Sequence, residues 1–87
     1  MPYLVNLTPQ AEKDLARLDK IVAQNVANKI DWLSHNIENI IPIPLKGKFK
    51  DKYKLRIGDW RVIYSIEHDY HTITIYAIKH RSEVYKI

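Results

Sequence analysis

Basic side chains occupy every second position from residue 46 to residue 56. They are Lys46, Lys48, Lys50, Lys52, Lys54 and Arg56. In an extended chain residues two apart share a face, so a strand here would carry a row of positive charge on one side. Like charges on one face repel each other and do not help folding. The row therefore predicts a partner that carries phosphate groups.

Two residues within this row interrupt the pattern of a strand. Gly47 and Asp51 favour a loop at the start of the row, so we expect only Lys52, Lys54 and Arg56 to share a strand face. A row of lysines can also serve only to protect the edge of a sheet against aggregation.

Arg61 stands inside a strongly apolar segment that we expect to be a strand. If the turn before it closes a hairpin, Arg61 lies near Lys54 and Arg56 on the neighbouring strand. Two roles are open for its guanidinium. It can pair with a carboxylate, Asp59 or Glu67, or it can bind a phosphate through two hydrogen bonds.

The segment after the last expected strand combines an imidazole, a guanidinium, a carboxylate and a phenol. Its functional residues are Lys79, His80, Arg81, Glu83 and Tyr85. Such a tail is usually solvated, but here the preceding strand returns it to the sheet that carries the basic row. Histidine suits proton transfer near neutral pH. Tyrosine can stack on a base, or act as a base itself where cations lower its pKa.

Several other kinds of site lack the residues they require. The sequence has no cysteine, which excludes disulfides, thiol catalysis and cysteine-based zinc sites. Gly47 and Gly58 are the only glycines, so a glycine-rich phosphate loop is excluded. His68, Asp69 and His71 follow no fixed ligand motif, and no serine has the context of a nucleophile elbow. We therefore expect neither a metal nor a cofactor.

The elements that would position these residues form one α+β domain over residues 1–87. The periodicity and turn signals predict a strand at 3–7, two helices within 9–39, and strands at 53–57, 60–66 and 72–78. Thr8-Pro9 would start the first helix, and the polar Asp19-Lys20 pair would separate it from the second. Pro42 and Pro44 make the next segment extended or turned. We expect an antiparallel two-helix hairpin on one face of a mainly antiparallel four-stranded sheet, followed by a short charged tail.

The net charge of +4 arises in the C-terminal half of the chain. Residues 1–45 carry four basic and five acidic side chains, whereas residues 46–87 carry ten basic and five acidic ones. A positive field on one side is expected of a docking face for nucleic acid, although an anionic membrane surface or an acidic protein would also fit. The sequence shows no signal-peptide pattern and no apolar run long enough to span a bilayer, so we expect a cytoplasmic protein.

Two segments resemble the RelE/ParE superfamily of toxins from type II toxin–antitoxin systems. They are Tyr53-Lys-Leu-Arg-Ile-Gly-Asp-Trp-Arg-Val-Ile-Tyr64 and His80-Arg-Ser-Glu-Val-Tyr85. The order and size of the expected elements match too, so the resemblance covers nearly the whole chain as a single RelE-like toxin domain. The second segment favours the RelE branch, whose members are ribosome-dependent endoribonucleases that cut mRNA in the A site. The ParE branch instead poisons DNA gyrase and generally lacks this tail.

The resemblance implies roles for individual residues. Lys52 and Lys54 would line the phosphate-binding face, Arg61 would contact the scissile phosphate, and Tyr85 would stack on a base or abstract a proton. The remaining basic residues, Lys46, Lys48, Lys50, Arg56 and Lys79, would attract RNA and the ribosome.

The group that protonates the leaving oxygen stays open between His80 and Arg81. Histidine is favoured because its ordinary pKa lies near neutrality. Some relatives carry an arginine where this chain has Lys79, and lysine cannot form the bidentate fork.

The expected chemistry is metal-independent cleavage of RNA by its own 2′-hydroxyl. It would give a 2′,3′-cyclic phosphate, or the 3′-phosphate from its hydrolysis, and a 5′-hydroxyl. Inhibition of gyrase on the same fold, and nucleic-acid binding without catalysis, are the alternatives. The implied partners are a RelB-like antitoxin, the ribosome and mRNA, with operator DNA as a further partner of the toxin–antitoxin complex. An acidic antitoxin segment that folds on binding would wrap the helices and cover or distort the site around Arg61.

Overall fold

The computed structural model describes residues 2–84, apart from the side chain of Lys48. Its helices and strands are β1 (Leu4–Leu7), α1 (Pro9–Arg17), α2 (Lys20–Asn36), β2 (Ile43–Pro44), β3 (Tyr53–Ile57), β4 (Trp60–Glu67), β5 (Thr72–His80) and α3 (Arg81–Val84). Single 3₁₀ turns are η1 (Ile37–Asn39), η2 (Gly47–Phe49) and η3 (His68–Tyr70). The strands form one sheet in the order β1-β5-β4-β3-β2.

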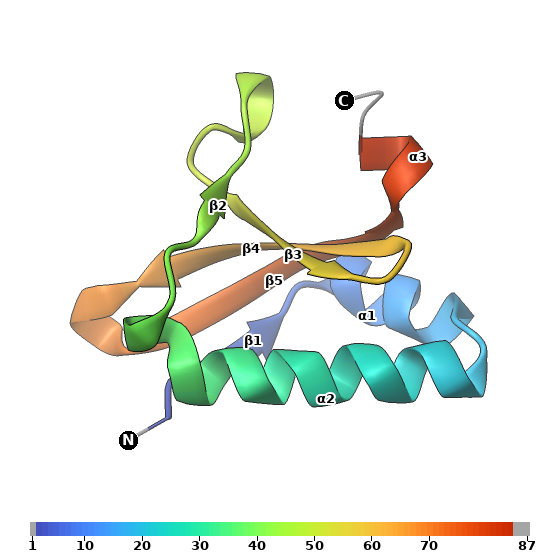
Figure 1. The fold of residues 1–87 in the computed structure, drawn as a ribbon, viewed down its shortest axis with the longest axis horizontal. Coiled ribbons are helices and arrows are strands. Elements are labelled where there is room, and N and C mark those ends of the chain that lie inside the picture. The colour runs from blue at the N-terminus through green and yellow to red at the C-terminus, as the bar shows by residue number, and fades with distance from the viewer. Residues whose placement is uncertain (1, 85–87) are drawn as a thin grey trace.

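The α+β architecture expected from the sequence is confirmed. Helices α1 and α2 lie against one face of the sheet and leave the other face without a helical layer (Figure 1). We call this second side the open face. The β1–β5 pair is parallel and the other pairs are antiparallel. No helix within residues 2–84 is long and apolar enough to cross a membrane.

The sheet has five strands where four were expected. The segment at Pro42 and Pro44 was expected to be extended or turned, and Ile43–Pro44 pairs with Lys54 and Tyr53 of β3. This addition is possible because β2 lies at the edge of the sheet, where a proline without an N–H breaks no inner ladder. The start of the basic row is a loop, as expected, since η2 occupies Gly47–Phe49.

Both helices begin at a side-chain cap, and the sequence predicts the first of these, Thr8. Thr8 Oγ1 accepts a hydrogen bond from Ala11 N at 3.1 Å, and Asp19 Oδ1 accepts one from Val22 N at 3.0 Å. Each cap satisfies an N–H that has no partner within its own helix. Asp19 therefore does more than separate the two helices, because it also starts the second one.

The core lies between α2 and the helix-covered face of the sheet. An apolar stripe along α2 and the turn after it belongs to the core, namely Val22, Val26, Ile30, Leu33 and Ile37. Val62 and Tyr64 of β4 and Ile73 and Ile75 of β5 meet this stripe and are almost fully buried. Burial raises the pKa of Tyr64 to about 12, so its phenol stays neutral under physiological conditions.

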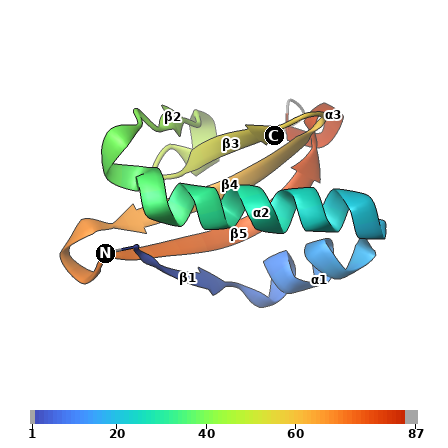
Figure 2. The ribbon, with the colours of Figure 1, turned by 60° about the horizontal axis from the view of Figure 1, so that its bottom comes forward.

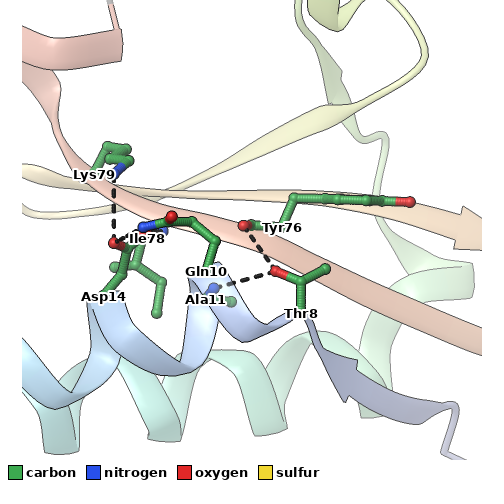
Figure 3. A network of polar contacts seen from close by, with 7 residues as sticks. All are labelled: Thr8, Gln10, Ala11, Asp14, Tyr76, Ile78 and Lys79. Carbon is green, nitrogen blue, oxygen red and sulfur yellow. Dashed lines mark hydrogen bonds and ion pairs between the residues drawn. The ribbon is translucent and has the colours of Figure 1, made fainter.

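One edge of β5 is completed by side chains of the first helix. β1 pairs with β5 only from Thr72 to Ile75, and α1 then continues along the same edge (Figure 2). Beyond that point Thr8 Oγ1 donates to Tyr76 O at 3.0 Å, and Asp14 Oδ2 accepts from Ile78 N at 2.9 Å (Figure 3). These two contacts replace the ladder that β1 no longer provides, so a helix takes over the role of an edge strand.

Asp14 also forms an ion pair with a residue of the same strand. Its Oδ1 lies 3.4 Å from Lys79 Nζ, and Gln10 Nε2 donates to it at 2.8 Å. Asp14 is 5% exposed, so its three partners all contact a buried carboxylate. A buried carboxylate with several donors is stabilised, whereas removal of the carboxylate leaves its donors without a partner.

We predict that Asp14→Ala lowers the free energy of unfolding by about 1–3 kcal/mol, because Ile78 N–H loses its acceptor inside the protein. Lys79→Met should cost less than about 1 kcal/mol, because a partly exposed ion pair contributes little. Asp14→Asn should fall between these two, since its amide oxygen can still accept from Ile78 N. Urea unfolding monitored by circular dichroism measures all three variants. Equal losses for Asp14→Ala and Lys79→Met would show that the ion pair, and not the hydrogen bond to Ile78 N, accounts for the stabilisation by Asp14.

Candidate functional site

Three basic residues are aligned in register across three strands, and the ammonium group of the third, Lys79, turns to Asp14 of α1 at the edge of the sheet. Arg56 of β3 pairs in register with Arg61 of β4, and Arg61 pairs in register with Lys79 of β5. We call these residues the cation row. The proximity of Arg61 to Arg56 was expected from the hairpin, whereas the alignment of Lys79 was not. Like charges directly opposite each other are destabilising, so this arrangement favours an anionic ligand.

Arg61 is buried, with 4% of its surface exposed. Its Nη1 donates to Gly58 O at 2.8 Å and to Trp60 O at 2.9 Å, so it braces the turn between β3 and β4. Among the described residues, neither Asp59 nor Glu67 forms an ion pair with it. The expected pairing of Arg61 with a carboxylate is therefore wrong, because its partners are backbone carbonyl groups. A buried cation held by carbonyl groups has a net charge left for an anion.

A cleft of about 420 Å³ opens on the same side of the sheet. It is lined by Pro44, Leu45, Lys46, Gly47, Phe49, Lys54, Ile63 and Val84. The segment from β2 to η2 rises above the sheet at one side of this region and α3 rises at the other (Figure 1). Apolar walls with two ammonium groups suit a ligand that has both an apolar ring and a negative charge.

The expected strand face of β3 lies next to this cleft. Lys54 lines the cleft, and Lys52 Nζ lies 4.5 Å from the centre of the Tyr76 ring. Arg56, two residues beyond Lys54, belongs to the cation row and is exposed. The structure therefore brings the three residues to one face, as predicted. Lys46 reaches the cleft from the loop, whereas Lys50 comes just after η2 and is exposed.

The start of the tail is attached to the turn between β3 and β4. Arg81 N donates to Asp59 O at 2.8 Å, and Arg81 Nε lies 3.7 Å from Asp59 Oδ1. Because Arg61 Nη1 bonds to the adjacent Gly58 O, both guanidinium groups contact the same two-residue turn. α3 then continues from Arg81 to Val84, which lines the cleft.

His80 lies on the other side of the strand from the cation row. It pairs in register with Trp60, and the two rings meet edge to face at 5.4 Å. Its Nδ1 accepts a hydrogen bond from Ser82 N at 3.3 Å, which leaves Nε2 as the ring nitrogen that can exchange a proton with a ligand. Tyr85, the remaining predicted catalytic residue, lies outside the described residues.

The open face also holds Tyr76, which sequence reasoning did not select. The register between β4 and β5 shifts after Ile63, so Ile63 faces Ala77 while Tyr64 faces Ile75. Tyr76 is the extra residue of this bulge. Counted forward from the buried Ile73 and Ile75, alternation already points Tyr76 away from the helices, and the bulge then returns Ile78 to the buried side.

The histidines near η3 have structural contacts. Tyr3 Oη and His68 Nδ1 are hydrogen-bonded at 3.1 Å, and the Tyr3 ring also packs against His71. Within residues 2–84 no three histidine or acidic side chains gather closely enough to hold a metal ion.

Comparison with known proteins shows which family this chain matches. The family model described as ParE toxin of type II toxin-antitoxin system, parDE, matches residues 5–85. The toxins RelE and RelG of Mycobacterium tuberculosis are each 30% identical to this chain, over 86 and 87 residues. Each alignment covers 99% of this chain, with 89% of RelE and 99% of RelG.

Solved structures of the same kind have a similar fold. The toxin–antitoxin complex RelBE2 of Mycobacterium tuberculosis matches with a TM-score of 0.83 and 26% identity, over 94% of each chain. The archaeal RelE–RelB complex of Pyrococcus horikoshii OT3 matches with a TM-score of 0.74 and 30% identity, over 93% of this chain and 97% of its own.

We predict that the cation row gives the folded protein a measurable affinity for inorganic phosphate. Phosphate at constant ionic strength should raise the melting temperature of the wild type, because an anion bound only to the native state stabilises it. Arg56→Gln should reduce this rise, since it removes one exposed member of the row. Lys13→Gln, an exposed change on α1, is the matched control. Differential scanning fluorimetry measures the rise, and equal rises in all three proteins would contradict the prediction.

Proposed function

We propose that this chain, which belongs to the RelE/ParE superfamily of toxins from type II toxin–antitoxin systems and is RelE-like, is a ribosome-dependent endoribonuclease. Its substrate would be mRNA in the A site of the ribosome, and its effect would be arrest of translation and growth. The observation that carries the proposal is the cation row, with the buried Arg61 at its centre, beside a cleft that combines apolar walls with lysines.

Cleavage of RNA can use the nucleophile that the substrate itself supplies. The 2′-oxygen forms a bond to phosphorus as the bond from phosphorus to the 5′-oxygen breaks. The 2′-hydroxyl proton goes to a base and the departing 5′-oxygen receives a proton, giving a 2′,3′-cyclic phosphate and a 5′-hydroxyl. Negative charge grows on the phosphoryl oxygens during this step, and cations fixed in advance stabilise it. Arg61 and Lys54 are proposed for that role, with Arg56 and Lys79 beside them.

The proton transfers are assigned to the tail. Tyr85 is proposed as the base or the stacking residue, on the resemblance alone. Arg81 shares the Gly58-Asp59 turn with Arg61, so it is well placed to stabilise the charge on the departing 5′-oxygen. His80 can exchange a proton through Nε2, but it must turn away from Trp60 to reach a phosphate bound at Arg61.

The proposed partners fit the same face. Both solved relatives are complexes, one of a RelE toxin with a RelB antitoxin and the other of the RelBE2 pair. We propose a RelB-like antitoxin for this chain, with an acidic segment that folds over the cation row and the helices, and a complex that binds its own operator DNA. A toxin that acts on ribosomes would work in the cytoplasm.

Inhibition of DNA gyrase is the second candidate, because the matching family model is described as a ParE toxin. The resemblance of residues 80–85 to the RelE branch favours the ribonuclease. The two candidates differ in the effect that expression of the toxin has on the cell. A ribonuclease stops protein synthesis and creates new mRNA 5′ ends, whereas a gyrase inhibitor causes DNA damage.

We predict that Arg61→Ala lowers the rate of mRNA cleavage on programmed ribosomes by roughly 10²- to 10³-fold, the usual effect of losing one preorganised group that stabilises the transition state. Mapping of mRNA 5′ ends in a purified translation system measures it. Arg17→Ala, an exposed change on α1, is the matched control and should cleave at the wild-type rate. Melting curves of both variants exclude a loss of folding.

Cleavage at the wild-type rate by Arg61→Ala would reject the assignment of the site. If the wild type itself produced no new 5′ ends but did trap DNA breaks with purified gyrase, the gyrase alternative would replace the ribonuclease.

A further inference from the structure

An aromatic residue, Tyr76, lies at the β-bulge of β5 and faces the open side of the sheet. Ile73, Ile75 and Ile78 of β5 are all buried in the core on the helix-covered side. In a regular strand one outward residue separates two inward ones. Between the inward Ile75 and Ile78 there are two outward residues, Tyr76 and Ala77. Bulges redirect side chains in this way and are frequent beside functional sites.

The contacts of Tyr76 confirm the direction of its ring. Lys52 Nζ lies 4.5 Å from the ring centre, and Ser65 Oγ lies 3.4 Å from the phenol oxygen as its donor. Lys52 lies just before β3 and Ser65 lies in β4, and both reach the ring on the side of the sheet away from the helices. Figure 3 shows the Tyr76 side chain lying above β5, on the side opposite to α1.

The backbone of Tyr76 is held in place from the other side. Thr8 Oγ1 donates to Tyr76 O, and the same oxygen caps α1 by accepting from Ala11 N. The bulge is therefore fixed to the start of the first helix. A ring on a fixed backbone loses little conformational freedom when a ligand packs against it.

The chemistry around the ring matches an unpaired nucleotide. Single-stranded RNA is recognised by aromatic side chains that stack on its bases and by cations that contact its phosphates. Tyr76 offers a ring that is only partly buried, Lys52 offers an ammonium group beside it, and the cation row lies on the same face.

We propose that Tyr76 is a base-stacking residue for the single-stranded RNA that flanks the scissile phosphate, with Lys52 as its phosphate-binding neighbour. When a base stacks on the ring, Lys52 leaves the ring and pairs with the adjacent phosphate. This proposal rests on the proposed function for its substrate, and it assigns to Tyr76 binding and not proton transfer.

Binding of an uncleavable RNA tests this role. The probe is a fluorescent mRNA with a 2′-O-methyl group at the nucleotide that would attack, presented on programmed ribosomes and, separately, as a free single strand. Tyr76→Leu should weaken binding by roughly 5- to 150-fold, the usual effect of losing one stacked base. Tyr76→Phe keeps the ring and should bind within about twofold of the wild type. Tyr70→Leu, at an exposed tyrosine in η3, is the matched control and should bind as the wild type does.

The salt dependence of binding separates stacking from charge. Lys52→Met should reduce the slope of log affinity against log salt by about one, because one phosphate contact is lost. Tyr76→Leu should leave this slope unchanged while it lowers affinity at every salt concentration. Melting curves check that each variant is folded.

Three outcomes of these experiments test the role of Tyr76. Wild-type affinity in Tyr76→Leu, on both the ribosome and the free strand, overturns the proposal. A change of salt slope in Tyr76→Leu equal to that in Lys52→Met also overturns it, because Tyr76 would then only orient the lysine. If the wild type binds the free strand through Tyr76 but cleaves no RNA on ribosomes, the stacking site stands and the proposed function fails.

Discussion

The C-terminal part of β5 depends on hydrogen bonds that come from outside the sheet. β1 ends at Leu7, and beyond it Thr8 and Asp14 provide partners for two polar groups of that edge, Tyr76 O and Ile78 N. A strand edge without partners is destabilising when buried and invites other chains when exposed. β5 carries Tyr76 and Lys79 and leads into the tail. By fixing the edge of β5, the first helix therefore helps to set the positions of these residues.

Charge repulsion within the cation row destabilises the native state, and the fold offsets this repulsion only in part. Arg56, Arg61 and Lys79 lie next to one another across the sheet, and within the described part of the chain only Asp14 forms an ion pair with a member of the row. Arg61 relies on two backbone carbonyls. The free protein therefore keeps a concentration of positive charge that a bound anion would relieve. Stability and ligand binding are linked at this face, since whatever neutralises the row also stabilises the native state.

Local signals were enough to predict most of the elements. The cap at Thr8 and the strand at Tyr53–Ile57 depend on neighbouring residues, and both are confirmed. The sequence did not reveal the short strand Ile43–Pro44, because a two-residue strand with a proline exists only through its partner. The parts of the site that were not predicted depend on pairing between distant strands. The alignment of Lys79 with Arg61 results from the register of β4 and β5, which shifts at Tyr76.

Charge alone does not distinguish the two polyanions proposed for the open face. An acidic antitoxin segment and an RNA strand would both be attracted by Arg56 and Lys79, because Coulomb attraction at an exposed surface carries little information about shape. An RNA strand differs in having bases, and only a ring such as that of Tyr76 and the apolar walls of the cleft respond to them. An antitoxin could therefore neutralise the toxin by covering the cations, without imitating a nucleotide. Recognition of RNA would depend on Tyr76 at the bulge in β5 and on the cleft, because these features contact bases and do not act through charge.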